Sequence, residues 1–386
     1  MSLPLRLAWC APVVALMLLW PSGVAAQQQP PLRFVGEFDI PDKAIELGGT
    51  TVGGLSGLTY DARRGVYYII CDDRGEFGPA RFYTARIDIG LDGIRDVQLL
   101  GVTLLDSDIA TPGIQPYESG ESDTEEIVLM PDDTLLISSE RDRQNRPWLR
   151  RFALDGSLLA ELPIPETFQL ASMPDGSGRN VQTRGVRPNL GFEGVTLAPD
   201  ESALYAMNEE ALAQDGPIAT PAAGTNVRLL RYSVDGSDAV PGRQVVYRTE
   251  PIFATPVPPD QFADNGVSAM LFIRHVLPQF DFLVMERSFV TGVGIDVNIF
   301  GVRIGTAPDV STLAALPSPL LSATMEKTLL VNMAALGIAA DNLEGLVLGP
   351  RLPDGRASLL VIADDNFSET QTNQFLLFEV DAIAGK

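Results

Sequence analysis

LEGLVLGPRLPDGRASLLVIADDN, residues 343–366, contains the pattern on which the fold depends: an acidic residue, an apolar strand, a turn, and a second apolar strand that ends in carboxylates. Four more copies of the pattern have a small or acidic residue at the position equivalent to Glu344. They are GLSGLTYDARRGVYYIICDDR at 54–74, TEEIVLMPDDTLLISSER at 124–141, FEGVTLAPDESALYAMNEE at 192–210 and VSAMLFIRHVLPQFDFLVMERS at 267–288. The equivalent residues Ser56, Glu125, Glu193, Ser268 and Glu344 are 69, 68, 75 and 76 residues apart. Such an interval accommodates the four strands of one β-propeller blade with generous loops.

The two ends of the chain together supply one more interval. There are 42 residues after Glu344 and 30 from Gln27 to Ser56. Apolar alternation and turn residues predict three strands in the fifth repeat, and Leu32–Phe38 is expected to be its fourth strand, which would leave no unpaired edge. We therefore predict an all-β protein, a β-propeller of five four-stranded blades closed by pairing of the N- and C-terminal strands. The alternative is six blades, one of which has lost the pattern.

The first 26 residues have the pattern of a secretory signal peptide. Arg6 precedes an apolar run, and small residues end at Ala26 before three glutamines. The run is too short to span a membrane comfortably. We expect residues 1–26 to be removed and residues 27–386 to form a single domain in the periplasm or outside the cell, with no stable membrane insertion. Cys71 is then the one remaining cysteine, so no internal disulfide is expected.

The charge and the scarcity of histidine exclude several classes of function. The whole chain has a formal net charge of −22, and the remainder has −23 because the removed segment holds one arginine and no acidic residue. Such a surface repels nucleic acid and favours divalent cations. A single histidine, His275, excludes a histidine phosphatase, a two-histidine phosphodiesterase and a zinc site with several imidazoles. A Ser-His-acid triad would have to use His275.

Acidic residues recur at one end of the predicted blades, near the axis and beside the long loops. Crowded carboxylates raise one another's pKa, and a bound cation is the simplest compensation. Oxygen ligands without imidazole or thiolate select Ca²⁺ or Mg²⁺, and Ca²⁺ tolerates an irregular coordination shell. The candidate metal ligands are Asp72, Asp73, Glu125, Glu193, Glu209, Glu286, Glu344, Asp364 and Asp365. The alternative for each is a structural role, capping a strand end or pairing with an arginine.

Three arginines, Arg74, Arg141 and Arg287, directly follow acidic residues at the same place in three repeats. A planar guanidinium is suited to holding a phosphate or carboxylate at two points. Phosphoester hydrolysis needs a metal ion to polarise the phosphoryl oxygen and to activate a water molecule, and positive charge to stabilise the other oxygens. A metal ion and arginines beside the water-filled mouth of the propeller would supply both. We therefore assign candidate catalytic roles to these arginines, Glu193 and Glu344, with the alternative that the arginines only neutralise adjacent acids.

The repeated blocks resemble the phytase-like family of secreted bacterial proteins with an esterase-like activity. The blocks are 53–74, 123–141, 191–210, 266–287 and especially 341–368, and the resemblance covers essentially the whole chain after the signal peptide. It implies a phosphodiester or phytase-type activity that rests on recurrent acidic residues. These correspond to Asp72, Glu125, Glu193, Glu209, Glu344, Asp364 and Asp365. The fourth repeat departs from the family pattern at Ser268-Ala269, so a ligand there would have to come from Glu286.

These observations lead us to expect a secreted, Ca²⁺-dependent hydrolase that acts on a small-molecule phosphoester or ester, with metal-activated water as the nucleophile. One alternative is a glycosidase with paired carboxylates. Aromatic residues that stack on sugars would support it, but few are expected in the loops around the mouth of the propeller. The other is a non-catalytic, Ca²⁺-stabilised propeller that binds a partner through its long loops. A propeller fold by itself does not choose among these functions.

Overall fold

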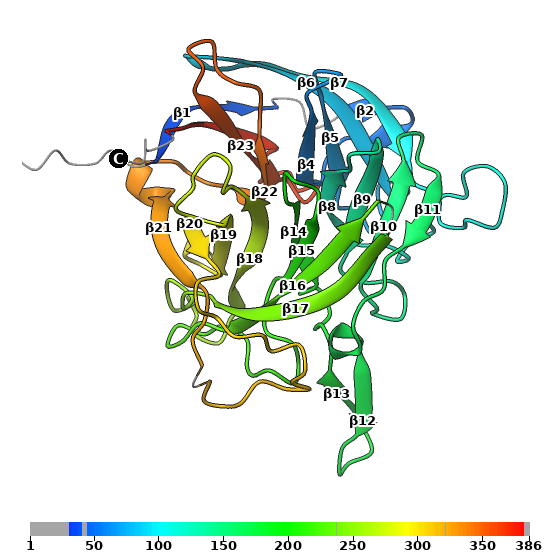
Figure 1. Ribbon diagram of the computed structural model, residues 1–386, viewed down its shortest axis with the longest axis vertical. Coiled ribbons are helices and arrows are strands. Elements are labelled where there is room, and N and C mark those ends of the chain that lie inside the picture. The colour runs from blue at the N-terminus through cyan, green and yellow to red at the C-terminus, as the bar shows by residue number, and fades with distance from the viewer. Residues whose placement is uncertain (1–30, 41–44, 237, 321, 382–386) are drawn as a thin grey trace, which may run out of the picture. The chain divides into compact units, whose positions relative to one another are not determined.

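The computed structural model describes residues 31–40, 45–236, 238–320 and 322–381. Within these residues, five antiparallel four-stranded sheets surround a common axis as the blades of a β-propeller (Figure 1). The predicted signal peptide lies outside the described residues. The described part of the chain contains no helix with the length and apolar character needed to span a membrane.

The chain forms four blades in succession, each an up-and-down sheet. The first contains β4 (Leu55–Asp61), β5 (Val66–Cys71), β6 (Arg81–Gly90) and β7 (Gly93–Leu104), and the second β8 (Thr124–Leu129), β9 (Thr134–Ser139), β10 (Trp148–Ala153) and β11 (Leu158–Glu161). The third contains β14 (Phe192–Leu197), β15 (Ala203–Asn208), β16 (Asn226–Asp235) and β17 (Asp238–Arg248), and the fourth β18 (Ala263–Phe272), β19 (Phe282–Val290), β20 (Gly294–Arg303) and β21 (Glu326–Asn332). Each repeated sequence pattern therefore forms the first two strands of a blade.

The fifth blade closes the ring with strands from both ends of the chain. It contains β22 (Asn342–Leu348), β23 (Ala357–Asp364), β24 (Gln374–Val380) and, outermost, β1 (Leu32–Asp39). β1 runs antiparallel to β24, with Leu32 opposite Val380 and Asp39 opposite Gln374. The first strands of successive blades contact one another in the closed order β4, β8, β14, β18, β22. The predicted closure and the count of five blades are confirmed, and the alternative of six blades is wrong.

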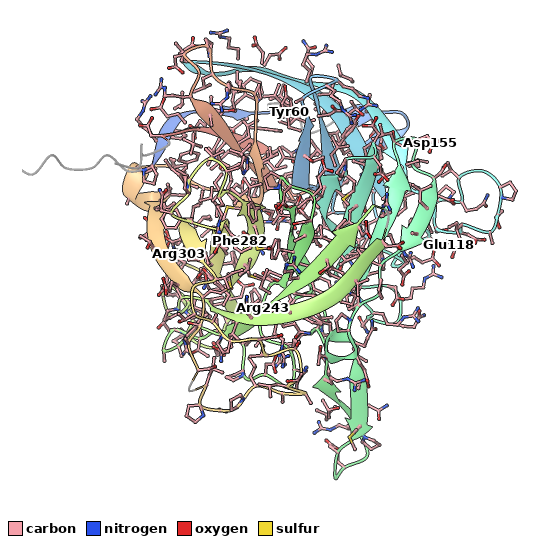
Figure 2. All side chains as sticks on the ribbon, viewed as in Figure 1. Tyr60, Glu118, Asp155, Arg243, Phe282 and Arg303 are labelled. Atoms are coloured by element: carbon pink, nitrogen blue, oxygen red, sulfur yellow. The ribbon has the colours of Figure 1, made fainter. Side chains whose placement is uncertain are left out.

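Hydrophobic clusters fill the spaces between neighbouring blades. Figure 2 shows side chains occupying these spaces, and Phe282 packs there between the third and fourth blades. Because each blade packs against two neighbours, its central strands are buried on both faces. All seven residues of β24 are buried for this reason, which explains why that strand reads as a nearly continuous apolar run.

Each innermost strand carries a β-bulge at the position of the repeated small or acidic residue. The register shifts occur between Leu55 and Leu58, Thr124 and Ile127, Phe192 and Gly194, Val267 and Ala269, and Leu343 and Gly345. A bulge changes the direction of the extra residue's side chain. A Cβ atom on Gly194 would lie 2.8 Å from the Met270 side chain, and one on Gly345 would lie 2.5 Å from the Ser56 carbonyl oxygen. The Glu-Gly step therefore allows neighbouring inner strands to approach closely beside a redirected carboxylate.

The remaining elements lie in the connections. A hairpin of β12 (Ala171–Pro174) and β13 (Asn180–Arg184) projects away from the blades (Figure 1), and β2 (Glu46–Leu47) pairs with β3 (Thr50–Thr51). Short 3₁₀ helices occur at Glu166–Phe168 and Ala334–Leu336.

The connection between the third and fourth strands of the fourth blade is long. Its described residues are 304–320 and 322–325. Within this segment the Val310 amide donates to the Gln244 carbonyl and the Met325 amide to the Val246 carbonyl. The insertion therefore covers the outer edge of β17, which would otherwise present unpaired backbone groups.

Candidate functional site

A cavity of about 1130 Å³ lies at the end of the blades where the innermost strands begin. Among the described residues it is lined by ten carboxylates and one arginine. The acidic residues are Glu37, Asp39, Asp72, Glu125, Glu140, Glu193, Glu209, Asp264, Asp341 and Glu344, and the arginine is Arg287. These side chains come from all five blades. The propeller thus brings together acidic residues that are up to 307 positions apart in the chain.

Two groups of three carboxylates have a spacing that could hold a metal ion. One is Asp72, Asp123 and Glu125, the other is Glu125, Glu140 and Glu193, and within each group one oxygen per residue lies within 4.8 Å of the others. Asp72 Oδ1 and Glu193 Oε2 are buried without a hydrogen-bond partner in the described part of the chain. An unsatisfied buried carboxylate oxygen is costly. Oxygen-only ligands fit a hard divalent cation, so the residues present could hold a metal ion of that class.

The pKa values of these carboxyls are raised. Burial is the main cause for Asp72, Glu125 and Glu193, and repulsion by neighbouring carboxylates adds to it. Burial, followed by the charge of Asp123, raises the pKa of Glu140 to about 8. Without a cation, part of this cluster is therefore protonated at neutral pH, and cation binding must compete with protons.

Arg287 lies on the cavity wall between two other carboxylates. Its Nη1 donates to Glu344 Oε1 and to Asn342 Oδ1, and its Nη2 is 3.3 Å from Glu209 Oε1. Burial opposes the charged guanidinium, but Glu344 and Glu209 outweigh it and raise the pKa of Arg287. Glu344 Oε2, in contrast, has no hydrogen-bond partner among the described residues. Arg287 thus combines a permanent positive charge with a neighbouring carboxylate oxygen that has no protein partner in the described chain.

The other two predicted arginines do not line this cavity. Arg141 Nε donates to Asp123 Oδ2 at 2.6 Å, and its Nη2 donates to Asn189 Oδ1 at 2.6 Å. Arg74 Nε lies 3.5 Å from Asp123 Oδ1, and half of the Arg74 side chain is exposed. Both arginines therefore contact the acidic cluster through Asp123, which is consistent with the neutralising role given as their alternative.

Two predicted metal ligands have protein partners away from the cavity. Asp73 accepts hydrogen bonds from three backbone amides of the following turn and pairs with the buried Arg81 at 2.7 Å. Glu286 pairs with Lys327 at 2.8 Å and accepts from the Glu250 amide at 2.7 Å. The structure thus gives Asp73 and Glu286 the structural contacts that were the alternative for every candidate.

The last two predicted ligands follow β23. Asp365 accepts from the Gly54 amide and from Asn373 Nδ2, both at 3.0 Å, and does not line the cavity. Asp364 Oδ1 accepts from the Asn366 amide at 2.7 Å, whereas Asp364 Oδ2 is buried without a partner in the described chain. Burial and the charge of Glu344 raise the pKa of Asp364, so this residue adjoins the acidic cluster. Asp365 instead ties the fifth blade to the first.

Several acidic residues that line or adjoin the cavity were not among the predicted ligands. Asp123 and Asp264 lie just before the repeated pattern, and Glu140 follows the second strand of its blade. Asp264 was missed because β18 begins at Ala263, before the repeat that was recognised in the sequence. His275 follows the end of β18 that lies away from the cavity, and no histidine lines the cavity in the described chain. A triad that uses His275 would therefore lie outside this cavity.

A family model described as phytase-like, esterase-like activity of phytase, matches residues 50–367. The protein belongs to the phytase-like family. The match includes both groups of three carboxylates and Arg287, and it confirms the resemblance found in the repeats. This phytase-like protein thus contains buried acidic clusters that could hold a metal ion, in a family described by an esterase-like activity.

Solved structures resemble this phytase-like chain only distantly. The periplasmic gluconolactonase of Pseudomonas aeruginosa is 12% identical, with a TM-score of 0.35 over 86% of this chain and 87% of that one. A candidate glycosidase from Bacteroides thetaiotaomicron is 9% identical, with a TM-score of 0.42 over 86% and 87%. Drosophila semaphorin 1a is 10% identical, with a TM-score of 0.33 over 84% and 76%. No curated protein matches the sequence. Neither fold nor function is assigned from these similarities.

The raised pKa values predict how the metal-free protein responds to pH. The folded state keeps the proton of Glu140 up to about pH 8, whereas the unfolded chain loses it near the ordinary value of 4.5. The contribution of Glu140 to stability is therefore fully present below pH 4.5 and is lost as the pH rises to about 8, by roughly 1.4 kcal/mol per pH unit for the one proton retained. Thermal unfolding in chelator at constant ionic strength should show a falling melting temperature from pH 5 to 8. Glu140→Gln should make this slope shallower, and a flat or rising profile would contradict the protonated cluster.

Proposed function

We propose that this phytase-like protein is a Ca²⁺-dependent hydrolase of phosphoester or ester bonds that acts in the periplasm or outside the cell. The observation that carries the proposal is the pair of carboxylate groups that share Glu125 and, except for Asp123, line the same cavity as Arg287. Hydrolysis of such bonds requires positive charge where negative charge develops in the transition state. The esterase-like description of the family supports this reaction class, and the pattern of residues 1–26 supports the location.

Glu125, Glu140 and Glu193 are the residues that would hold the cation. Asp123 in the other group already pairs with Arg141, so its charge is partly compensated. Glu140 accepts a hydrogen bond only from the Gly191 amide among the described residues, and Glu193 Oε2 has no donor. When bound, a divalent cation would supply Lewis-acid polarisation of the substrate oxygen and lower the pKa of a nearby water. The absence of nitrogen and sulfur ligands favours Ca²⁺ or Mg²⁺, and the irregular arrangement on β8, on β14 and directly after β9 favours Ca²⁺.

Arg287 and Glu344, which line the same cavity, would act on the substrate. Arg287 is positioned to bind a phosphoryl or carbonyl oxygen, because Glu344, Asn342 and Glu209 fix its guanidinium at the cavity surface. Glu344 Oε1 is occupied by this arginine, while Oε2 is available to accept the proton of an attacking water. Arg287 would thus bind the substrate, while Glu344, its partner in the ion pair, would remove the proton from water.

Metal binding provides the first test of the proposal. Titration of metal-free protein with CaCl₂ should show binding by calorimetry, and Ca²⁺ at 100 times its Kd should stabilise the fold by about 2.7 kcal/mol, a rise of a few degrees in melting temperature. Hydrolysis of bis-(p-nitrophenyl) phosphate or p-nitrophenyl acetate should disappear in chelator and return with Ca²⁺. No Ca²⁺ binding at millimolar concentration would refute the metal site. Binding without turnover of any phosphoester or ester would instead support a non-catalytic propeller, and turnover of a glycoside would support a glycosidase.

A further inference from the structure

The cavity lining contains apolar as well as acidic side chains. Besides the acidic residues, its lining includes Phe262, Phe289, Ile295, Ala339 and Ala340. The phenyl rings of Phe262 and Phe289 have their centroids 6.1 Å apart and their planes inclined by 33°. Phe262 is 63% exposed and Phe289 is 38% exposed. An apolar surface is therefore continuous with the carboxylate cluster and open to a ligand.

The strand pairing explains why these rings face the cavity. Ala263 of β18 pairs with Val290 of β19, and both residues contribute to a small hydrophobic cluster. Successive side chains of a strand point to opposite faces, so the adjacent Phe262 and Phe289 project away from that cluster. Neither phenylalanine belongs to a hydrophobic cluster of the described chain. Exposed aromatic side chains in the lining of a concave polar site are typical of contacts to an apolar ligand group.

The charge of the cavity restricts the ligand further. Ten carboxylates face a single arginine in the described lining, and one divalent cation would offset only two of the negative charges. Although raised pKa values keep some of these carboxyls protonated, each further negative charge on a ligand is repelled by those that are ionised. A polyanion such as an inositol polyphosphate is therefore a poor match for this site.

We infer that the natural substrate is an ester with at most one negative charge and an aromatic or other apolar group that packs on Phe262 and Phe289. This inference rests on the proposed function, because it places the bond to be hydrolysed at the carboxylates and Arg287. Phe262 and Phe289 would then determine specificity, while Arg287 and the carboxylates act on the ester itself.

Binding of two phosphodiesters tests the inference without requiring catalysis. Diphenyl phosphate and dimethyl phosphate each carry one negative charge and differ in their apolar groups. In calorimetric titrations of Ca²⁺-saturated protein, diphenyl phosphate should bind at least tenfold more tightly. Phe262→Ala should reduce this preference at least threefold. Phe253→Ala is the matched control, because Phe253 is 42% exposed but does not line the cavity, and it should leave the preference unchanged.

The outcomes separate this inference from the proposed function. Equal affinity for the two diesters, a preference that survives Phe262→Ala, or tighter binding of inositol hexakisphosphate than of diphenyl phosphate would overturn the inferred substrate class. Turnover of small esters could still be observed in any of these cases, and the proposed hydrolase function would stand. Conversely, a preference for diphenyl phosphate that depends on Phe262, in a protein that hydrolyses no ester, would support the apolar subsite and overturn the hydrolase.

Discussion

Replacing Glu193 or Glu344 by glutamine is expected to lower the hydrolysis of a phosphodiester or aryl ester at least tenfold, about 1.4 kcal/mol in the activation barrier. Glutamine keeps the shape of the side chain and one oxygen but removes the negative charge. At Glu193 the lost charge weakens cation binding, and at Glu344 it removes the oxygen proposed to accept a proton. The measurement is kcat/KM at saturating Ca²⁺, together with Ca²⁺ affinity by calorimetry. Glu193→Gln should lower both, whereas Glu344→Gln should lower turnover more than Ca²⁺ affinity.

Glu126→Gln is the matched control for these variants. Glu126 lies beside Glu125 and is buried, but it faces a separate pocket of about 470 Å³ lined by residues such as Leu58 and Met270. Burial raises its pKa well above the ordinary value, so the neutral glutamine closely matches the protonated side chain. This variant should retain its activity. Full activity in the double variant at positions 193 and 344, or undiminished turnover by the wild type in excess chelator, would contradict the metal-dependent mechanism.

Deleting residues 27–40 is expected to unfold the whole ring. The deletion removes β1, which pairs with β24 and buries Leu32, and it leaves the Phe378 ring without Phe34, whose centroid is 5.5 Å away. Each lost apolar contact of this size costs roughly 1.5–3 kcal/mol and each lost ladder hydrogen bond roughly 0.5–1.5 kcal/mol. The sum is on the order of 5 kcal/mol or more, comparable to the whole stability of many proteins. Thermal and urea unfolding should show a large loss of stability or no cooperative transition.

A deletion of similar size in the β12–β13 hairpin is the control. Ala171 and Arg184 pair at the base of this hairpin, and most residues beyond them are exposed or partly exposed. Replacing residues 172–183 by a two-residue turn should therefore leave the melting temperature nearly unchanged. If both deletions had the same small effect, pairing of β1 with β24 would not be what closes the propeller.

The architecture could be predicted because the sequence pattern that encodes it recurs at regular intervals. Each copy of the pattern encodes two adjacent strands and a turn, and the interval between copies leaves room for two more. The closing strand was predictable from the lengths of the two ends, which together match one blade. The sequence did not show that the connection between β20 and β21 covers a strand edge. That role depends on its hydrogen bonds to β17 of the preceding blade.

The candidate site was predictable only in its location and its chemistry. Acidic residues in phase with the blades had to meet at one end of the axis, and Asp72, Glu125, Glu193, Glu209 and Glu344 do line the cavity there. The direction of each side chain depends on partners that are distant in sequence. Asp73 is bound by Arg81, and Glu286 is bound by Lys327 from the last strand of its own blade. Neighbouring acids of the same type therefore have different roles.

The sequence by itself determined the repeating blade unit, its closure by both ends of the chain and the acidic character of one face, since these properties follow from spacing and composition, and the structure decided for five blades over six. The tertiary structure alone decided which carboxylates form the two groups that could hold a metal ion, and it placed Arg287 between Glu209 and Glu344 and brought the phenyl rings of Phe262 and Phe289 into the lining of the same cavity. The physical reason is that coordination and ion pairing depend on distances of a few ångströms between blades. Those distances are set by the bulges and by the packing of neighbouring sheets.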